Sequence, residues 1–193
     1  IVFIGDLVDR GPDPKAALDI VCDLLNEHPK TSVISGNHEL AMCGALGLIQ
    51  TPDYANWAQR WLDDYGAEST FAAFDVEYRQ LETLKQRLDE RHVALLSDLP
   101  WVVEHPQYLF VHAGLDPNTP YAMQLRILQR RDYTLNRPQW LCSKSLVNAE
   151  VPPDCPQIVV SGHVQVPSVK FSPKRLLIDT TGGLGGDLSC VLL

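Results

Sequence analysis

The chain has 193 residues, of which 45% are hydrophobic and 21% charged, and this composition excludes the disordered and fibrous classes of protein. Its formal net charge of -8 argues against nucleic acid or an anionic membrane as a partner, because both bind basic surfaces. The five cysteines form no CxxC pair and no stretch reaches the roughly 18 apolar residues of a spanning helix, so we expect a cytoplasmic protein with reduced thiols.

The beginning of the chain predicts a strand, a helix and a second strand. Residues 1–4 are an apolar run, typical of a buried strand, that stops shortly before Asp6. Apolar residues at helical spacing predict a helix over about 15–26, and 32–35 predict the next strand. Strands joined by a helical crossover are parallel, so their ends would bring Asp6 and Asn37 together.

The middle of the chain is predicted to be mostly helical. A helix is expected over 39–49, and the periodicity of 54–91 indicates two or three helices that form a cap over about 51–92. The aromatic residues of this cap are interpreted as core packing. An antiparallel pair of strands is predicted over 101–104 and 108–111. The remaining predicted elements are a helix within 117–138 and four strands, over 158–161, 169–171, 176–179 and 188–193.

A potential metal ligand follows each of four predicted strands. Asp6 and Asn37 follow the first two strands, and His112 and His163 follow later ones. Open α/β sheets bind ligands at the carboxyl ends of their strands, so these side chains are expected to converge. Two imidazoles, a carboxylate and an amide oxygen suit Mn, Fe or Zn better than Ca or Mg. The other histidines are interpreted as structural: His28, His92 and His105.

Three further polar residues lie next to these ligands. Asp9 and Arg10 follow Asp6 in a turn, and His38 follows Asn37. A carboxylate that binds a histidine fixes its tautomer, which fits Asp9 orienting His38 as a proton donor to a leaving group. The planar fork of Arg10 suits phosphate oxygens. The alternative is a loop network of Asp9 and Arg10 that binds no ligand.

Four short segments of the sequence combine glycine with Asp, Asn or His: Gly5–Gly11, Gly36–Glu39, His112–Gly114 and Gly162–His163. In this order they resemble four of the five sequence blocks of the PPP-type calcineurin-like metallophosphoesterases. The spacing of the segments and the tail over 177–186 resemble the bacterial serine/threonine protein phosphatase branch. The resemblance implies an α/β fold, a calcineurin-like metallophosphoesterase β-sandwich flanked by helices in αββα layers, in a single domain over 1–193.

The resemblance also implies a site with two divalent metal ions, with Mn expected and Fe or Zn as alternatives. Asp6 would bridge the two ions, and Asn37, His112 and His163 would complete the shell of the second ion. A hydroxide held by the metals would then attack phosphorus in line, without a phosphoenzyme.

The remaining roles follow from the same resemblance. His38, supported by Asp9, would be the general acid, and Arg10 and Asn37 would contact the substrate phosphate. Relatives often carry a second phosphate-binding arginine after a tryptophan, at a place that Lys144 occupies in this chain. Lys144 is therefore the expected second phosphate contact, and the alternatives are Arg130 and Arg131.

The first block of the family, Asp-x-His-Gly, does not occur in this chain, and no later Asp-x-His replaces it. We therefore expect a chain that is truncated before Ile1 and lacks the first strand of the sheet and two metal ligands. Such a chain would hold at most one metal ion well, and we expect that it can be inactive in this form.

The leading functional hypothesis is metal-dependent hydrolysis of phosphate monoesters, with phosphoserine or phosphothreonine in proteins as the preferred substrate. Glu39 favours this hypothesis, because the dinucleotide-cleaving relatives more often carry Asp there. The alternatives are a symmetrical diadenosine tetraphosphate hydrolase and a non-catalytic scaffold that binds phosphate. The expected partner is thus a phosphoprotein or a small phosphoester, and not nucleic acid or a membrane.

Overall fold

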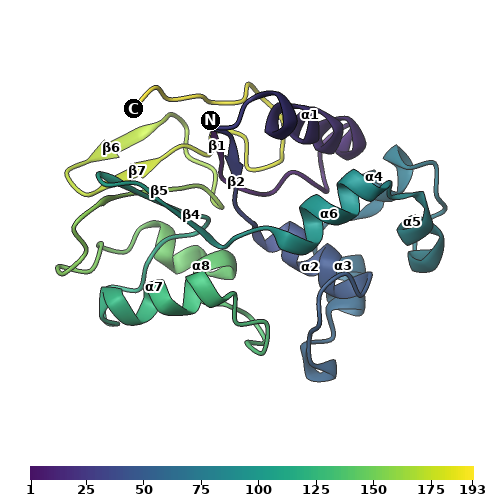
Figure 1. The fold of residues 1–193 in the computed structure, drawn as a ribbon, viewed down its shortest axis with the longest axis horizontal. Coiled ribbons are helices and arrows are strands. Elements are labelled where there is room, and N and C mark those ends of the chain that lie inside the picture. Colours follow the sequence, from purple (N-terminus) through teal and green to yellow (C-terminus); the bar gives the residue numbers. More distant parts are fainter.

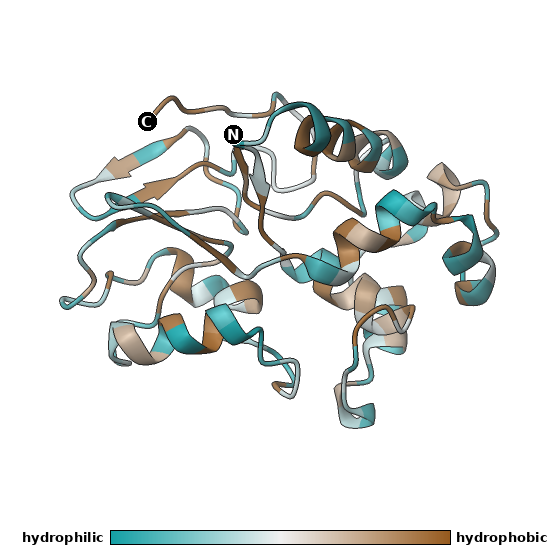
Figure 2. Cartoon of the chain, viewed as in Figure 1, coloured by the Kyte–Doolittle hydropathy of each residue, from teal (hydrophilic) through white to brown (hydrophobic).

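The first two strands of the chain pair with each other, as the computed structural model of residues 1–193 shows (Figure 1). Strand β1 (Val2–Phe3) lies parallel to β2 (Ser32–Val33), and helix α1 (Pro14–Glu27) connects them. Helix α1 begins where the side chain of Asp13 accepts a hydrogen bond from the backbone N–H of Ala16. It carries hydrophilic and hydrophobic residues on different sides (Figure 2). The predicted parallel strand–helix–strand unit is confirmed.

The other strands form a five-stranded mixed sheet in the order β3-β4-β5-β7-β6. Strands β4, β5 and β7 run parallel, and the two edge strands β3 and β6 are antiparallel to their neighbours. The predicted antiparallel pair before residue 112 is therefore confirmed as β3 and β4. The strands are β3 (Val102–Glu104), β4 (Tyr108–Val111), β5 (Ile158–Ser161), β6 (Lys170–Ser172) and β7 (Arg175–Leu177).

The three central strands of the five-stranded sheet, β4, β5 and β7, are mostly buried on both faces. One face contributes Phe110, Val160 and Leu176 to a small cluster, against which Val2 and Ile4 of the first strand region pack. Alternate residues, among them Leu109 and Val159, belong to a large cluster that extends into the helices. A sheet that is covered by a strand pair on one side and helices on the other agrees with the predicted α/β class and its layers.

Most of the helices precede the five-stranded sheet in the chain. Three of them, α3 to α5, lie in the region expected for the cap, which confirms the two or three predicted helices, and α6 follows them. The aromatic side chains of the cap are buried in the large cluster, as predicted. The helices are α2 (Asn37–Ala45), α3 (Trp57–Asp64), α4 (Glu68–Ala73), α5 (Leu81–Arg87), α6 (Glu90–Asp98), α7 (Tyr121–Arg130) and α8 (Gln139–Cys142). Two 3-10 turns, η1 (Asp53–Ala55) and η2 (Lys144–Val147), complete the list of elements.

Two predictions of secondary structure were wrong in detail. Helix α2 begins at Asn37 and not at residue 39, so Asn37 and His38 lie in its first turn. Residues 188–193 form no strand, because they pair with no neighbouring strand, although Val191 packs against the small cluster. None of the helices has the length and apolar character needed to cross a membrane.

Candidate active site

Two glycines allow the loop after β1 to approach the start of α2. A Cβ atom on Gly5 would lie 2.3 Å from the backbone nitrogen of Gly36, and one on Gly36 would lie 2.1 Å from Oδ1 of Asp6. Any larger residue at either position would therefore separate the two segments. The approach lets Asp6 Oδ1 accept a hydrogen bond from the backbone N–H of His38 at 3.2 Å. Asp6 and the helix that carries Asn37 are thereby joined, as predicted.

The carboxylate of Glu39 holds this arrangement from inside the protein. It is fully buried and accepts hydrogen bonds from the backbone N–H groups of Asp6 (2.8 Å), Val8 (3.2 Å) and Gly36 (2.8 Å). The bond from Gly36 also caps the N-terminus of α2. Glu39 therefore fixes the loop that carries Asp6 to the helix that carries Asn37.

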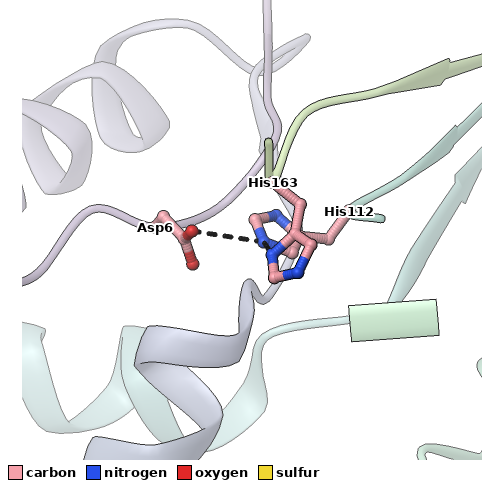
Figure 3. A group of neighbouring side chains, drawn as sticks. All are labelled: Asp6, His112 and His163. Atoms are coloured by element: carbon pink, nitrogen blue, oxygen red, sulfur yellow. Dashed lines mark hydrogen bonds and ion pairs between the residues drawn. The ribbon is translucent and has the colours of Figure 1, made fainter. Parts of the chain in front are cut away.

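Four candidate metal ligands converge on one point, and Figure 3 shows three of them. The Nε2 atom of His112 lies 3.2 Å from Oδ2 of Asp6, 3.2 Å from Oδ1 of Asn37 and 3.2 Å from Nδ1 of His163. The other ring nitrogen of His112 donates a hydrogen bond to the backbone carbonyl of Ile4 at 2.6 Å. All four residues predicted as ligands are thus brought together.

The four candidate ligand atoms fit a bound cation. Because Nδ1 of His112 donates to Ile4, the neutral ring presents a lone pair on Nε2, and the three atoms around it are also acceptors. Ligands that bind one ion at about 2.0–2.2 Å lie about 3.0–3.4 Å from each other, which matches the separations at this site. A mixed set of nitrogen and oxygen ligands suits Mn, Fe or Zn.

The charges at the site are strongly coupled. Burial disfavours a charged His112, but the charge of Asp6 and the hydrogen bonds to Asp6 and Ile4 together outweigh burial and raise the pKa of His112 to about 9. Burial, together with the positive charge of His112, lowers the pKa of His163 to about 4. Burial alone would raise the pKa of Asp6, yet the charge and hydrogen bond of His112 lower it below its usual range. Asp6 therefore stays ionised. In the absence of another cation, only one of the two imidazoles carries a positive charge.

His38 and Asp9 form a buried pair beside the ligand set. Nδ1 of His38 lies 2.8 Å from Oδ2 of Asp9, and its Nε2 has no partner in the protein and is available to the cavity. Asp9 also accepts hydrogen bonds from Nε1 of Trp61 (2.9 Å) and Oγ1 of Thr70 (2.7 Å). Burial opposes the charged form of His38, but the charge of Asp6 and the hydrogen bond of Asp9 raise its pKa. The geometry is that of a histidine prepared to donate a proton.

The loop that follows β1 adopts an uncommon backbone conformation. Asp6 (φ 58°), Asp9 (φ 69°) and Arg10 (φ 56°) lie in the left-handed region, and so does His163 (φ 71°). Such conformations are unfavourable for residues other than glycine and cluster at functional sites. The loop is therefore shaped by its tertiary contacts.

A cavity of about 440 Å³ opens in front of these residues. Arg10 lines it, held by a hydrogen bond from Nη1 to the carbonyl of Gly182 at 3.3 Å, and so does Lys144. The predicted phosphate contacts thus face the same space as Asp6, Asn37 and His38. The alternatives to Lys144 do not reach the cavity: Arg130 and Arg131 are absent from its lining, and Arg131 binds Asp98 at 2.7 Å.

The sequence reasoning missed several residues of the site. Trp61 was assigned to the core, and Thr70 carried no signal, although both bind Asp9. Glu39 was used as an indicator of substrate class, but its side chain is buried and does not line the cavity. Cationic and aromatic residues from the cap and from the segment before α8 were also missed. These cavity-lining residues are Arg60, Tyr65 and Arg137.

Comparisons with known proteins agree with this geometry. A family model described as calcineurin-like phosphoesterase matches residues 1–184. A protein from Geobacillus thermodenitrificans (strain NG80-2), named bis(5'-nucleosyl)-tetraphosphatase PrpE (asymmetrical), is 26% identical over 209 residues, which cover 98% of this chain and 73% of the relative. A crystal structure described as a candidate diadenosine tetraphosphatase matches with a TM-score of 0.53 and 21% identity, over 96% of this chain and 72% of that chain. That second likeness concerns the fold alone.

Proposed function

Because the chain belongs to the calcineurin-like phosphoesterase family, we propose that Asp6, Asn37, His112 and His163 hold a divalent metal ion at which phosphoester bonds are hydrolysed. The observation that carries the proposal is the convergence of three acceptor atoms, from Asp6, Asn37 and His163, around Nε2 of His112. No other His, Cys, Asp or Glu side chain joins this cluster, so the second ion of the expected pair stays a prediction. The identity of the ion, with Mn expected, is part of the same proposal.

Other residues of the cavity would bind the phosphate and protonate the leaving group. A bound metal ion would act as a Lewis acid on the phosphoryl oxygens and lower the pKa of water. Arg10 would bind the phosphate through its planar fork and Lys144 as a point charge. His38, oriented by Asp9, would give a proton to the oxygen of the leaving group as the phosphorus–oxygen bond breaks.

For the substrate we propose a dinucleoside polyphosphate first and a phosphoserine or phosphothreonine side chain second. The first class is supported by the name of the Geobacillus relative. The preference for phosphoserine or phosphothreonine was based on Glu39. The carboxylate of Glu39 binds backbone N–H groups and does not face the cavity. The residue type at this position therefore does not favour either substrate. Membership of the bacterial serine/threonine phosphatase branch remains a prediction.

A direct assay tests this proposal. The protein with added Mn²⁺ is expected to hydrolyse para-nitrophenyl phosphate, and EDTA should abolish the activity. Diadenosine tetraphosphate and a phosphoserine peptide are then compared by kcat/KM, with chromatography of the nucleotides to separate symmetrical cleavage to ADP from asymmetrical cleavage to ATP and AMP. Faster release of phosphate from the peptide would reverse the order of the two substrates.

Two matched variants identify the metal site. Asp6→Asn should lower both activity and the affinity for Mn²⁺ measured by calorimetry, because it removes the charge of a ligand that lies 3.2 Å from His112. Asp53→Asn, at an exposed aspartate outside the cavity, should leave both unchanged. Absence of metal-dependent hydrolysis on all three substrates would favour the non-catalytic, phosphate-binding alternative.

A further inference from the structure

Two arginines line the active-site cavity although no phosphate contact was expected from them. Arg60 comes from α3 of the cap and Arg137 from the segment before α8, and both face the cavity that Asp6 and His38 line. Neither forms an ion pair, although the chain has 24 acidic residues against 16 basic ones and Asp64 lines the same cavity. Unpaired cations in an acidic protein indicate a surface that receives an anion.

The guanidinium of Arg60 is fixed before any ligand arrives. Its central carbon lies 4.1 Å from the centre of the Trp57 ring, which is a cation–π contact. Its Nη1 atom donates hydrogen bonds to the backbone carbonyls of Ala55 (3.1 Å) and Asn136 (2.9 Å). These bonds use one nitrogen, so Nε and Nη2 remain available for the oxygens of a ligand.

Tyr65 lies next to His38 and lines the cavity together with the two arginines. We expect the leaving group to depart on the side of the cavity where His38 lies. The edge of the Tyr65 ring contacts the ring of His38, with 5.1 Å between ring centres. Burial raises the pKa of Tyr65 to about 12. Because His38 protonates the leaving oxygen, a leaving group that passes His38 meets Tyr65 and then the arginines.

We propose that Arg60 and Arg137 form a subsite for a phosphate group on the leaving side of the bond that is cleaved. This inference rests on the proposed function. In the reaction, the oxygen of water forms a bond to the phosphorus held at the metal ligands and Arg10, and water loses a proton to the solvent. The bond from that phosphorus to the bridging oxygen breaks, its electron pair stays on the leaving phosphate, and His38 supplies the proton that this oxygen takes up. The substrate class is a phosphoanhydride, whose leaving group is itself phosphorylated.

The surface next to the subsite has room for the rest of such a leaving group. A second hollow of about 420 Å³ is lined by five residues, among them Arg137, Cys142 and Lys144, which also line the first cavity. The two hollows are therefore neighbours that share Arg137 and Lys144 in their walls. A chain of phosphates could extend from the metal ligands past Arg60 and along these two cations.

The test compares substrates whose leaving groups carry a phosphate with one whose leaving group does not. Diadenosine tetraphosphate and inorganic tripolyphosphate are the two phosphoanhydrides, and para-nitrophenyl phosphate is the reference. Arg137→Gln should lower kcat/KM for both phosphoanhydrides about 10- to 100-fold, as expected for the loss of a charge-assisted hydrogen bond, and change the reference less than about twofold. The control is Arg130→Gln, at an exposed arginine outside the cavity.

Arg60→Gln should lower kcat/KM for the two phosphoanhydrides and not for the reference. Its midpoint of thermal unfolding is measured as well, because loss of the contacts to Ala55 and Asn136 would lower stability, whereas loss of substrate binding alone would not. Calorimetry with ADP gives a readout without turnover, in which Arg137→Gln binds more weakly than Arg130→Gln. An equal loss on all three substrates or no loss on the phosphoanhydrides would overturn the subsite and leave the proposed function intact. A wild type that cleaves only para-nitrophenyl phosphate would overturn the subsite and the proposed preference for a dinucleoside polyphosphate, but not the metal-dependent hydrolysis. Failure of the wild type on para-nitrophenyl phosphate with every metal ion would instead contradict the proposed function.

Discussion

Apart from His112, which lies beside Asp6 in the ligand set, two buried histidines each bind an aspartate, and the two pairs differ in what surrounds them. Nδ1 of His38 lies 2.8 Å from Asp9, and Nε2 of His92 lies 2.8 Å from Asp19. The side chains of both histidines are at most 3% exposed. Asp9 is fully enclosed, whereas Asp19 is 30% exposed and also binds Lys15 at 2.7 Å. By the distance between their atoms, the two pairs are indistinguishable.

The second nitrogen of each ring makes the difference. In His38 it is available to a cavity lined with cations, whereas in His92 it lies 3.4 Å from Oδ1 of Asp89. Asp19, Asp89 and His92 are close enough to hold a metal ion, but Lys15 and Arg91 already supply positive charge to their carboxylates. A carboxylate–histidine pair therefore indicates catalysis only when the free nitrogen faces a space that a substrate can enter.

The largest expected effect comes from the pair in the cavity. His38→Gln should lower kcat by about 10²- to 10⁴-fold on an alkyl phosphate, because the leaving alkoxide then lacks a proton donor. The loss on para-nitrophenyl phosphate should be far smaller, since nitrophenolate leaves without a proton. Steady-state kinetics on the two substrates measure the difference, and equal losses on both would remove the general-acid role.

The next effect concerns the residues that hold Asp9. Thr70→Val removes a hydrogen bond of 2.7 Å to the Asp9 carboxylate, and we expect a loss of roughly 1 kcal/mol, or about fivefold in kcat on the alkyl phosphate. Thr70→Ser keeps the hydroxyl and should restore most of this activity. If Thr70→Val only lowers thermal stability and kcat stays the same, Thr70 does not position His38 through Asp9.

The other pair should respond in stability and not in catalysis. His92→Gln removes a fully buried ring that binds Asp19 and contacts Phe74, so we expect a loss of about 1–3 kcal/mol in the free energy of unfolding. Urea denaturation gives the loss, and kcat on para-nitrophenyl phosphate should remain that of the wild type. A large fall in kcat at unchanged stability would erase the distinction between the two pairs.

The smallest expected effect is the pH dependence of Asp19. The hydrogen bond from Lys15, together with His92, lowers the pKa of Asp19 in the folded state. Its contribution to stability is therefore complete above the unfolded pKa near 4 and is lost as the pH falls through the lower, folded pKa. Because Asp19 is partly exposed, Asp19→Asn should cost only about 0.2–1 kcal/mol at pH 7, and the difference from the wild type should vanish in acid.

The candidate ligands could be predicted from the sequence because each follows an apolar run, and such runs are recognised from neighbouring residues alone. Asp6 and His112 are examples, and the structure brings them within 3.2 Å. The start of α2 was misplaced, because its capping box has glycine at the N-cap, where the usual signal is Ser or Thr. Helix α2 was therefore predicted to begin after Asn37 and His38 instead of at Asn37.

The residues that support the site could not be predicted in the same way. Thr70 binds Asp9 across 61 positions of sequence, and Trp61 across 52. Their own neighbours in the sequence predict only a helix with a buried face. Which polar atom a buried Trp or Thr meets is decided by how the cap packs, and no local pattern records that. The strand predicted over 188–193 does not form for a similar reason. A strand needs an unpaired edge of a sheet beside it, and the local sequence does not show whether such an edge is available.

The buried carboxylate of Glu39 has a consequence for the order in which the protein assembles. The left-handed conformations of Asp6, Asp9 and Arg10 are each unfavourable by about 1–2 kcal/mol, so the loop cannot hold them in isolation. Glu39 lies in the first turn of α2, and its bonds to the loop form only when that helix has docked. The loop and the helix should therefore become ordered in one step during folding. A local opening of α2 would separate the candidate ligands Asn37 and Asp6 from His112 and His163, while the five-stranded sheet remains folded.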